Sequence, residues 1–455
     1  MRVVALDVGS SSARAVVYDE RAVEIEGALA RRSYQPVVGP EGEAELDPSQ
    51  LVTAAREVLD EARAGSGGAG VDAVAISCFW HSLLLLDGRR RPLTPVLLWQ
   101  DRRAGPQAEE LAARLDQRRI HARTGSVLHP SYWPAKLAWL SATQPRLLAR
   151  ARHIVSFAEY LFLALGGELR MTLSSASGTG LLDLHTHAWD DELLDALQID
   201  ADLLPLLSAD PAGAEVPVFP PLGDGACSNL GAGCTTSDRA ALMIGTSGAY
   251  RVLHETERPQ PRRGLFCYLL DERRAVEGGS VSDGGNLHAW LERTLRLDDP
   301  RLEAPAATGP TFLPLLGGER SPGWNPAATG AVAGLTFDTG PDELYAAALA
   351  GIGYRFAEIA ALLQEVREVV ATGNALLASP PWIQLCADVL GRPVTASAVA
   401  EGSARGAAVY ALERLGWEPD RAPLGATYEP DPEQAEVHAA GRERQRLLYE
   451  RLFSP

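Results

Sequence analysis

One unit of sequence, a buried strand, a Gly/Ser turn and a second strand, occurs twice in this chain. The first copy, VVALDVGSSSARAVVY, spans 3–18, and the second, AALMIGTSGAYR, spans 240–251. Short apolar runs separated by glycine and small hydroxyl residues are typical of β-hairpins. A period of about half the chain is too long for a solenoid. We therefore predict two similar domains, 1–245 and 246–455, which present their turns to a shared cleft.

An aspartate flanked by glycines comes shortly before the second copy. Asp224 lies between Gly223 and Gly225, where we expect a sharp turn that lets the carboxylate project without a bulky neighbour. The residue types suggest a base at Asp224 and an anion-binding nest of N–H groups at 245–248. The ordinary alternatives are that Asp224 caps the helix expected at 226–230 and that the glycines form a common hairpin turn.

Length and composition limit the class of protein. A chain of 455 residues is longer than one hydrophobic core usually organises. The formal net charge of −17 disfavours nucleic acid and anionic membrane as partners, which need a concentrated basic face. The five cysteines lack the spacing of a zinc site or a disulfide scaffold. Because no segment resembles a signal peptide or has the roughly 18 apolar residues of a membrane span, we expect a cytoplasmic protein.

The basic residues are almost all arginine, and Lys136 is the only lysine. Codon bias would explain the scarcity of lysine. The other explanation is that Lys136 is retained where a compact ammonium works and a planar guanidinium does not.

Hydrophobic periodicity and capping residues predict further elements along the chain. After the first hairpin we expect a third strand at 22–32 and buried strands at 71–79, 83–86 and 96–99. The segment from Gly416 to the last helix is charged and contains prolines, and no strand is predicted in it. Helices are predicted at 47–64, 107–118, 286–294, 342–366, 381–390, 404–415 and 433–452.

Several separate segments form a further pattern, namely 7–14, 99–103, 223–225, 245–247, 312–326, and 371–374 with 384–388. Together they resemble motifs of the FGGY carbohydrate kinases, within the actin and Hsp70-like ATPase superfamily, over nearly the whole chain. In that family they correspond, in this order, to the first phosphate motif, the WxDxR segment, the catalytic-base turn, the second phosphate motif, the C-terminal signature and the adenosine motif. The resemblance implies an α/β fold of two actin-like (ribonuclease H-like) domains with a catalytic cleft between them. Within the family the sequence most resembles gluconate kinases, at 124–130, 245–249, 266–268 and 278–285.

The resemblance also implies roles in phosphoryl transfer from ATP. Asp224 would accept the proton of the attacking hydroxyl, and Asp7 would hold Mg²⁺ through water. Asn374 stands where the family usually has a second glycine, and we expect it to adopt the left-handed backbone of that turn. The nucleotide and its phosphates would be held by Ser10, Ser11, Ser12, Arg14, Gly245, Thr246, Gly285, Gly373 and Asn374.

The sugar would lie on the first domain, and D-gluconate is the first candidate. Xylulose, another ketose or a polyol is the second candidate, and a non-catalytic actin-like binding protein is the alternative from another class. We allow for a homodimer, and we expect the domains to close about a hinge near 244–251. His81 and Tyr132 could instead be core residues, and Asp101 could be paired with an arginine. At the start of its helix, Lys136 would contribute to the positive field that a sugar acid requires. The expected sugar-binding residues are Trp80, His81, Asp101, Ser131, Tyr132 and Lys136, beside Asp224.

Overall fold

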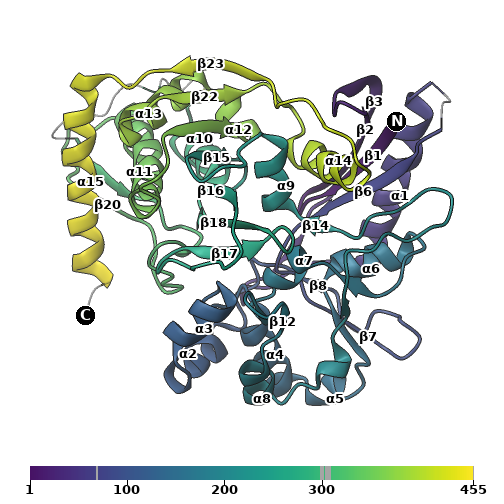
Figure 1. The fold of residues 1–455 in the computed structure, drawn as a ribbon. Helices are drawn as coiled ribbons and strands as arrows, with labels where there is room; N and C mark the ends of the chain where they lie inside the picture. The colour runs from purple at the N-terminus through teal and green to yellow at the C-terminus, as the bar shows by residue number, and fades with distance from the viewer. Residues whose placement is uncertain (68–69, 298–301, 303–308, 454–455) are drawn as a thin grey trace.

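The computed structural model describes residues 1–67, 70–297, 302 and 309–453, and shows two α/β domains, each built on one central sheet (Figure 1). The first sheet has the strand order β14-β6-β1-β2-β3, and the second has the order β17-β18-β16-β15-β21-β22-β23. The strands of the first sheet are β1 (Arg2–Val8), β2 (Ser12–Asp19), β3 (Glu24–Ser33), β6 (Ala73–Cys78) and β14 (Leu222–Gly223). Those of the second are β15 (Arg239–Ile244), β16 (Gly248–Glu255), β17 (Phe266–Leu269), β18 (Arg274–Val281), β21 (Glu368–Thr372), β22 (Val394–Ser397) and β23 (Leu424–Tyr428).

The two predicted hairpins occupy equivalent places in the two sheets. β1 pairs antiparallel with β2 and parallel with β6, and β15 pairs antiparallel with β16 and parallel with β21. The turns of both hairpins therefore lie at the same edge of their sheets, where the parallel strands end. β15 belongs entirely to the second sheet, so the boundary expected at 245/246 falls inside a hairpin, and the first sheet ends at β14.

The hinge expected near 244–251 stays a prediction, and strand pairing restricts it to the turn at 245–247. β16 pairs along its whole length with β18 on one side, and its residues 248–252 pair with β15 on the other. Strand residues bonded on both sides cannot absorb the changes in φ and ψ that a hinge requires.

Helices cover both faces of each sheet (Figure 1). α1 (Pro48–Gly65) packs on β2 and β3, and it is capped by the side chain of Asp47, which accepts from the N–H groups of Ser49 and Gln50. α9 (Asp224–Gly231) and α14 (Gly402–Arg414) cover the other face, although α14 follows the second sheet in sequence. The second domain also has α10 (Gly285–Leu295), α11 (Pro341–Leu362), α12 (Asn374–Leu377), α13 (Pro380–Leu390) and α15 (Pro432–Phe453).

α9 and α14 pack unusually closely because both have glycine at the contact. A Cβ on Gly406 would lie 1.8 Å from the carbonyl oxygen of Cys227, and one on Gly231 would lie 1.9 Å from that of Gly402. This pair of helices brings residues near 224 and near 402, which are far apart in sequence, to one place between the sheets.

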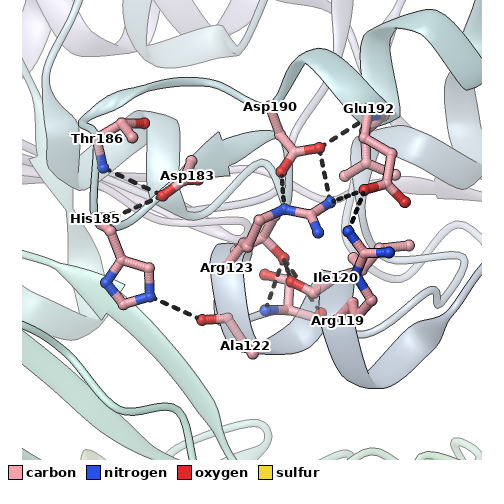
Figure 2. A network of polar contacts seen from close by, with 12 residues as sticks. Arg119, Ile120, Ala122, Arg123, Asp183, His185, Thr186, Asp190 and Glu192 are labelled. Atoms are coloured by element: carbon pink, nitrogen blue, oxygen red, sulfur yellow. Dashed lines mark hydrogen bonds and ion pairs between the residues drawn. The ribbon is translucent and has the colours of Figure 1, made fainter.

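A helical insert follows the first part of the N-terminal domain, and its helices within 105–148 and 191–197 lie at the bottom of Figure 1. Figure 2 shows how its pieces are joined: Arg123 Nε donates to Asp190 Oδ2 at 2.6 Å, and Arg123 also pairs with Glu192. The insert has α2 (Gly105–Arg114), α3 (Gln117–Thr124), α4 (Trp133–Thr143), α5 (Pro145–Leu148), α6 (Phe157–Ala164), α7 (Leu173–Ser177), α8 (Asp191–Leu197) and the 3₁₀ turn Ala201–Leu203. The short strand pairs are β7 (Leu84–Leu86) with β9 (His153–Val155), β10 (Arg170–Met171) with β13 (Leu206–Leu207), β11 (Leu182–Asp183) with β12 (Ala188–Trp189), and β19 (Thr311–Leu313) with β20 (Ala331–Ala333), while β4 (Val37–Val38), β5 (Ala44–Leu46) and β8 (Val96–Leu97) form a small sheet.

The predictions for three segments differ from the structure. The helix expected at 107–118 is two helices, α2 and α3, because Asp116 caps α3 by accepting from the N–H groups of Arg118 and Arg119. α11 ends at Leu362 rather than at 366. The segment after Gly416 contains a strand, β23, which pairs antiparallel with β22 at the sheet edge. No helix in the described part of the chain is both long and apolar enough to cross a membrane.

Candidate active site

Asp224 is the first residue of α9 and lies where the two domains meet. Its Oδ1 accepts from the N–H of Gly225 at 2.8 Å. Burial raises the pKa of Asp224, and the charge of Arg251 and hydrogen bonds from backbone N–H groups oppose that shift. Asp224 is itself the first helical residue and accepts from the N–H of the next residue, whereas an N-cap side chain accepts from an N–H two or three residues on, so the capping alternative does not describe it.

The glycines beside Asp224 make room for an indole ring. A Cβ on Gly223 would lie 1.8 Å from Trp80 Cε2, and one on Gly225 would lie 2.4 Å from Trp80 Cζ3. Neither glycine has a positive φ. The expected sharp turn is confirmed, since β14 ends at Gly223 and α9 begins at Asp224; the glycines also allow close packing against Trp80, whose Nε1 donates to Ser174 O at 2.8 Å.

Asp7 is the second acid at this place and lies near the end of β1. Its Oδ1 accepts from Ser77 Oγ at 2.8 Å, and its Oδ2 lies 3.5 Å from Arg14 Nη1. Burial raises the pKa of Asp7 to about 6, while Arg14 lowers it. A single carboxylate with cavity on one side suits a cation that keeps most of its water ligands.

Both hairpin turns face one large cavity of about 580 Å³ between the domains, which we call the large cavity. Ser11 and Thr246 line it from opposite domains, and Asp224 lines it as well. Ser12 does not: it is buried, and its Oγ accepts from Arg14 Nη2 at 3.1 Å. Arg14, expected to reach phosphates, pairs with Glu401 at 2.9 Å in addition to Asp7.

The glycines expected to hold the nucleotide line the same cavity. The N–H of Gly285 donates to Gly245 O at 2.8 Å, so the start of α10 lies directly against the second turn. Gly373 has φ +87°, and a Cβ there would lie 2.4 Å from Ile244 O. Asn374 was expected to need the left-handed region, but it is the first residue of α12, and the positive φ belongs to Gly373.

A smaller inner cavity of about 260 Å³ continues from the large cavity past Asp224 and Asp7. Trp80 and His81 line it, together with Ser10 and the aromatic residues Trp99 and Tyr268. His81 has φ +68°, a left-handed conformation that a histidine adopts at some cost and that is frequent at functional sites. Burial lowers the pKa of His81 well below its usual value, so the ring is neutral; its Nδ1 donates to Gly178 O at 2.5 Å, which leaves Nε2 as an acceptor.

An outer cavity of about 300 Å³ adjoins the inner one and is lined by Asp101 and Ser131. Asp101 pairs with Arg103, whose Nη2 lies 2.5 Å from Asp101 Oδ2 and also contacts Glu45. The ion-pair alternative for Asp101 is therefore the arrangement observed. Ser131 Oγ donates to Trp99 O at 2.8 Å.

Tyr132 and Lys136 lie behind the lining residues rather than in a cavity. The hydroxyl of Tyr132 is 2.6 Å from that of Tyr268, and the ring is fully buried. Lys136 is 1% exposed, and its Nζ donates to His81 O and Ser131 O, both at 2.8 Å. Lys136 is not a solvated helix residue. It joins the two backbone segments from which His81 and Ser131 extend.

Two buried arginines at this site were not predicted from the sequence. Arg320 lies between the inner and outer cavities, with its guanidinium 5.0 Å from the ring of Trp99 and 5.9 Å from that of Trp324. Arg251 lies between the inner and large cavities. Both belong to segments quoted above, 312–326 and 240–251, but an arginine in a motif gives no sign of whether it finds a carboxylate partner in the fold.

The arrangement places a buried carboxylate, the turns of two hairpins and adjoining cavities for two molecules around Asp224. Such a site can move an anionic group from one molecule to a hydroxyl of the other. Comparison with known proteins agrees with group transfer to a hydroxyl. Residues 2–222 match the N-terminal domain of the FGGY family of carbohydrate kinases, and residues 240–413 match its C-terminal domain.

The relatives include kinases of several substrates. A gluconokinase of Bacillus subtilis (strain 168) is 28% identical and aligns over 90% of this chain and 87% of its own length. A xylulose kinase of Escherichia coli (strain K12) is 29% identical over 99% of both chains. A glycerol kinase of Leptothrix cholodnii is 32% identical over 92% of this chain and 94% of its own.

Solved structures agree with the fold. A xylulose kinase and a gluconate kinase, both from Lactobacillus acidophilus, superpose with TM-scores of 0.90 and 0.89. Each is 26% identical and covers 100% of this chain and 98% of its own. The two-domain α/β fold, the paired hairpins and the family matches lead to one conclusion: the chain belongs to the FGGY family of carbohydrate kinases, phosphotransferases whose acceptor is an alcohol group.

Proposed function

We propose that this kinase transfers the γ-phosphate of ATP to a hydroxyl of a sugar acid, with D-gluconate as the first candidate. The observation that carries the acidic substrate is Arg320. It is 8% exposed, its Nε has no hydrogen-bond partner, and it forms no ion pair with a carboxylate of the described residues. A buried cation without a counter-ion is unfavourable. A carboxylate on the substrate would supply the missing charge.

The aromatic rings around Arg320 support this role. Trp99 and Trp324 lie within cation–π distance and hold the guanidinium in place, so less side-chain entropy is lost when a carboxylate binds. The expectation that Lys136 supplies the positive field is replaced here, because its ammonium is already used by two carbonyls. Gluconokinase relatives support the same substrate class.

In the proposed reaction Asp224 accepts the proton of the attacking hydroxyl as that oxygen bonds to the γ-phosphorus and the bond to the β–γ bridging oxygen breaks. The N–H groups of the turns at Ser11 and Thr246 would bind the phosphates from opposite domains. Gly285 and Gly373 line the large cavity, where the ribose and adenine would lie, and they pack closely on the second turn, since a Cβ at either would collide with the backbone of 244–245.

Mg²⁺ fits the acidic end of the site. Asp7 has cavity beside it and hydrogen bonds that fix its carboxylate, and Mg²⁺ is usually held by one or two carboxylates together with phosphates and water. When bound, the ion would neutralise charge on the nucleotide phosphates. We propose ATP and Mg²⁺ as the requirements, a cytoplasmic location, and a homodimer as the assembly to be tested.

A neutral ketose such as xylulose is the second candidate. It is supported by the xylulose kinase relative that aligns over 99% of both chains. The distinction between the two lies in Arg320, because a neutral sugar leaves its charge unmatched. A coupled assay of ADP release over a panel of aldonates, ketoses and polyols tests the proposal. We expect the highest kcat/KM with an aldonate, and a preference for a ketose or polyol would overturn the acidic assignment. ADP release with none of them would favour the non-catalytic alternative.

A further inference from the structure

Arg251 of β16 is fixed beside the proposed catalytic base by residues of two other elements, β18 and α9. Its side chain passes over Gly278 of β18, where a Cβ would lie 2.8 Å from Arg251 Cγ. It ends beside Gly225 of α9, where a Cβ would lie 2.4 Å from Arg251 Nη1. Asn229, also on α9, donates from Nδ2 to Arg251 O at 3.0 Å. The helix that begins with Asp224 therefore contacts both the backbone and the guanidinium of Arg251.

The guanidinium of Arg251 has unused donors. The residue is 6% exposed, and its Nε and Nη2 have no hydrogen-bond partner. It makes no ion pair with a carboxylate in the described part of the chain, although the charge of Asp224 is close enough to interact with it. An arginine stays protonated in proteins. A buried charge with unpaired donors is expected where a ligand brings the opposite charge.

The position of Arg251 indicates which anion that is. It lines both the large cavity, where the nucleotide would lie, and the inner cavity, where the sugar would lie. Among the described residues shared by both cavities, Arg14 is the other cation, and it is already paired with Asp7 and Glu401. Arg320 lines the inner and outer cavities but not the large one. Arg251 is thus the available cation at the point where the two ligands meet.

We propose that Arg251 is a catalytic residue that donates from Nε and Nη2 to oxygens of the phosphoryl group during its transfer. The inference rests on the proposed phosphoryl transfer, but not on which sugar accepts. In the step, the sugar oxygen bonds to the γ-phosphorus, the bond to the bridging oxygen of ATP breaks, the hydroxyl proton passes to Asp224, and ADP leaves with the electron pair. The non-bridging oxygens of the transferring phosphoryl group carry negative charge. The planar guanidinium would stabilise this charge with two N–H donors that are already in position before the reaction.

The test compares Arg251→Met with Arg251→Lys in the full-length enzyme, on its best sugar. Arg239→Met is the matched control, since Arg239 lies at the far end of the same hairpin and pairs with Glu368. We expect Arg251→Met to lower kcat by roughly 10²- to 10³-fold with KM values for ATP and sugar within about threefold. Arg251→Lys should retain only a small part of kcat, because an ammonium cannot present two parallel donors.

A rescue experiment with a second pair of variants distinguishes a catalytic role from a folding defect. Arg251→Gly leaves a space between Gly225 and Gly278, and added guanidinium ion should restore part of kcat in that variant but not in Arg239→Gly. A purely structural arginine would lower the melting temperature without such rescue, and that result would overturn the role.

The remaining outcomes separate this proposal from the proposed function. If the parent turns over and Arg251→Met turns over equally well, the role of Arg251 is overturned and the kinase assignment stands. If Arg251→Met raises KM for acidic sugars alone, Arg251 binds the substrate carboxylate and the role proposed here is wrong. If the parent releases no ADP with any sugar, both assignments fall together.

Discussion

The indole of Trp80 fills the space in front of Gly223, so that a Cβ added at Gly223 would lie 1.8 Å from Trp80 Cε2. The residue before the proposed base must therefore be glycine, because the indole that lines the inner cavity leaves no room for a side chain there. The position of Asp224 depends on this contact as much as on the helix that it begins.

Gly223→Ala should accordingly damage both stability and catalysis. The added methyl group must displace the indole, and overpacking of this kind typically lowers the free energy of unfolding by about 1–3 kcal/mol. We expect kcat/KM to fall as well, because the displaced ring lines the sugar side of the site. Urea unfolding and steady-state kinetics measure the two effects.

Gly105→Ala is the control for that change, since nothing lies within 4 Å of a Cβ there. In Gly223→Ala combined with Trp80→Phe, the smaller ring should recover part of the lost stability. If Gly223→Ala destabilises the parent and the Trp80→Phe variant equally, the two residues are not coupled.

Lys136→Met should weaken binding of every sugar that the enzyme accepts. The ammonium bonds the carbonyls of His81 and Ser131, and each buried carbonyl left without a donor costs about 1–3 kcal/mol. The segments that carry both residues should then loosen. Lys136→Arg should weaken sugar binding almost as much, because a fully buried site for an ammonium has no room for a guanidinium.

One acidic and one neutral substrate separate this account from a direct effect of charge. We expect KM to rise for both. A rise confined to the acidic substrate would instead support the original expectation that Lys136 contributes to the positive field of the cleft.

Much of this site follows from the sequence because its features are local. The two strand-turn-strand units, Asp224, and the glycines at 245, 285 and 373 lie in motifs whose spacing is visible in the chain. The structure brings them to one cavity. The backbone at 373–374 was predicted less well. Of these two residues Gly373 has the positive φ, and Asn374 is the first residue of a helix.

What the sequence could not predict depends on long-range partners. Arg14 and Arg251 stand in equivalent hairpins, yet Arg14 meets Glu401 from the distant start of α14 and Arg251 meets no carboxylate among the described residues. The burial of Lys136 likewise depends on two carbonyls, five and 55 residues away. β23 escaped prediction because its residues are mostly exposed and form an edge strand, which gives little hydrophobic signal.

The free energy of unfolding should decrease as the pH rises, because of Glu159, whose side chain is 0% exposed. Burial raises its pKa to about 7 from 4.5. The folded state therefore holds a proton that the unfolded state has lost, and the free energy of unfolding falls as pH rises from 4.5 to 7. The shift corresponds to a loss of about 3 kcal/mol over this range.

Glu159→Gln removes the titration while keeping an amide that can accept from Ser156 N. Urea unfolding of parent and variant at about pH 5 and pH 8 should show a smaller decrease in the variant. The same decrease in both proteins would assign the pH dependence to other groups.

Activity should be lost as pH falls, because Asp224 must be ionised to accept a proton. Burial raises its pKa above the ordinary 3.8, so the acid limb of kcat/KM should lie above that value. A neutral substrate in saturating Mg²⁺ separates this limb from titration of a sugar acid. An acid limb at or below 3.8 would contradict the environment described for Asp224.

The role of Asp224 as general base is the central claim, and Asp224→Asn tests it most directly. The amide keeps the shape of the carboxylate but cannot take the hydroxyl proton. In single-turnover experiments at saturating ATP and sugar, we predict a transfer rate lower by roughly 10²-fold or more, with the dissociation constants of both ligands nearly unchanged. Transfer at close to the parent rate would contradict the account and remove Asp224 from the chemistry.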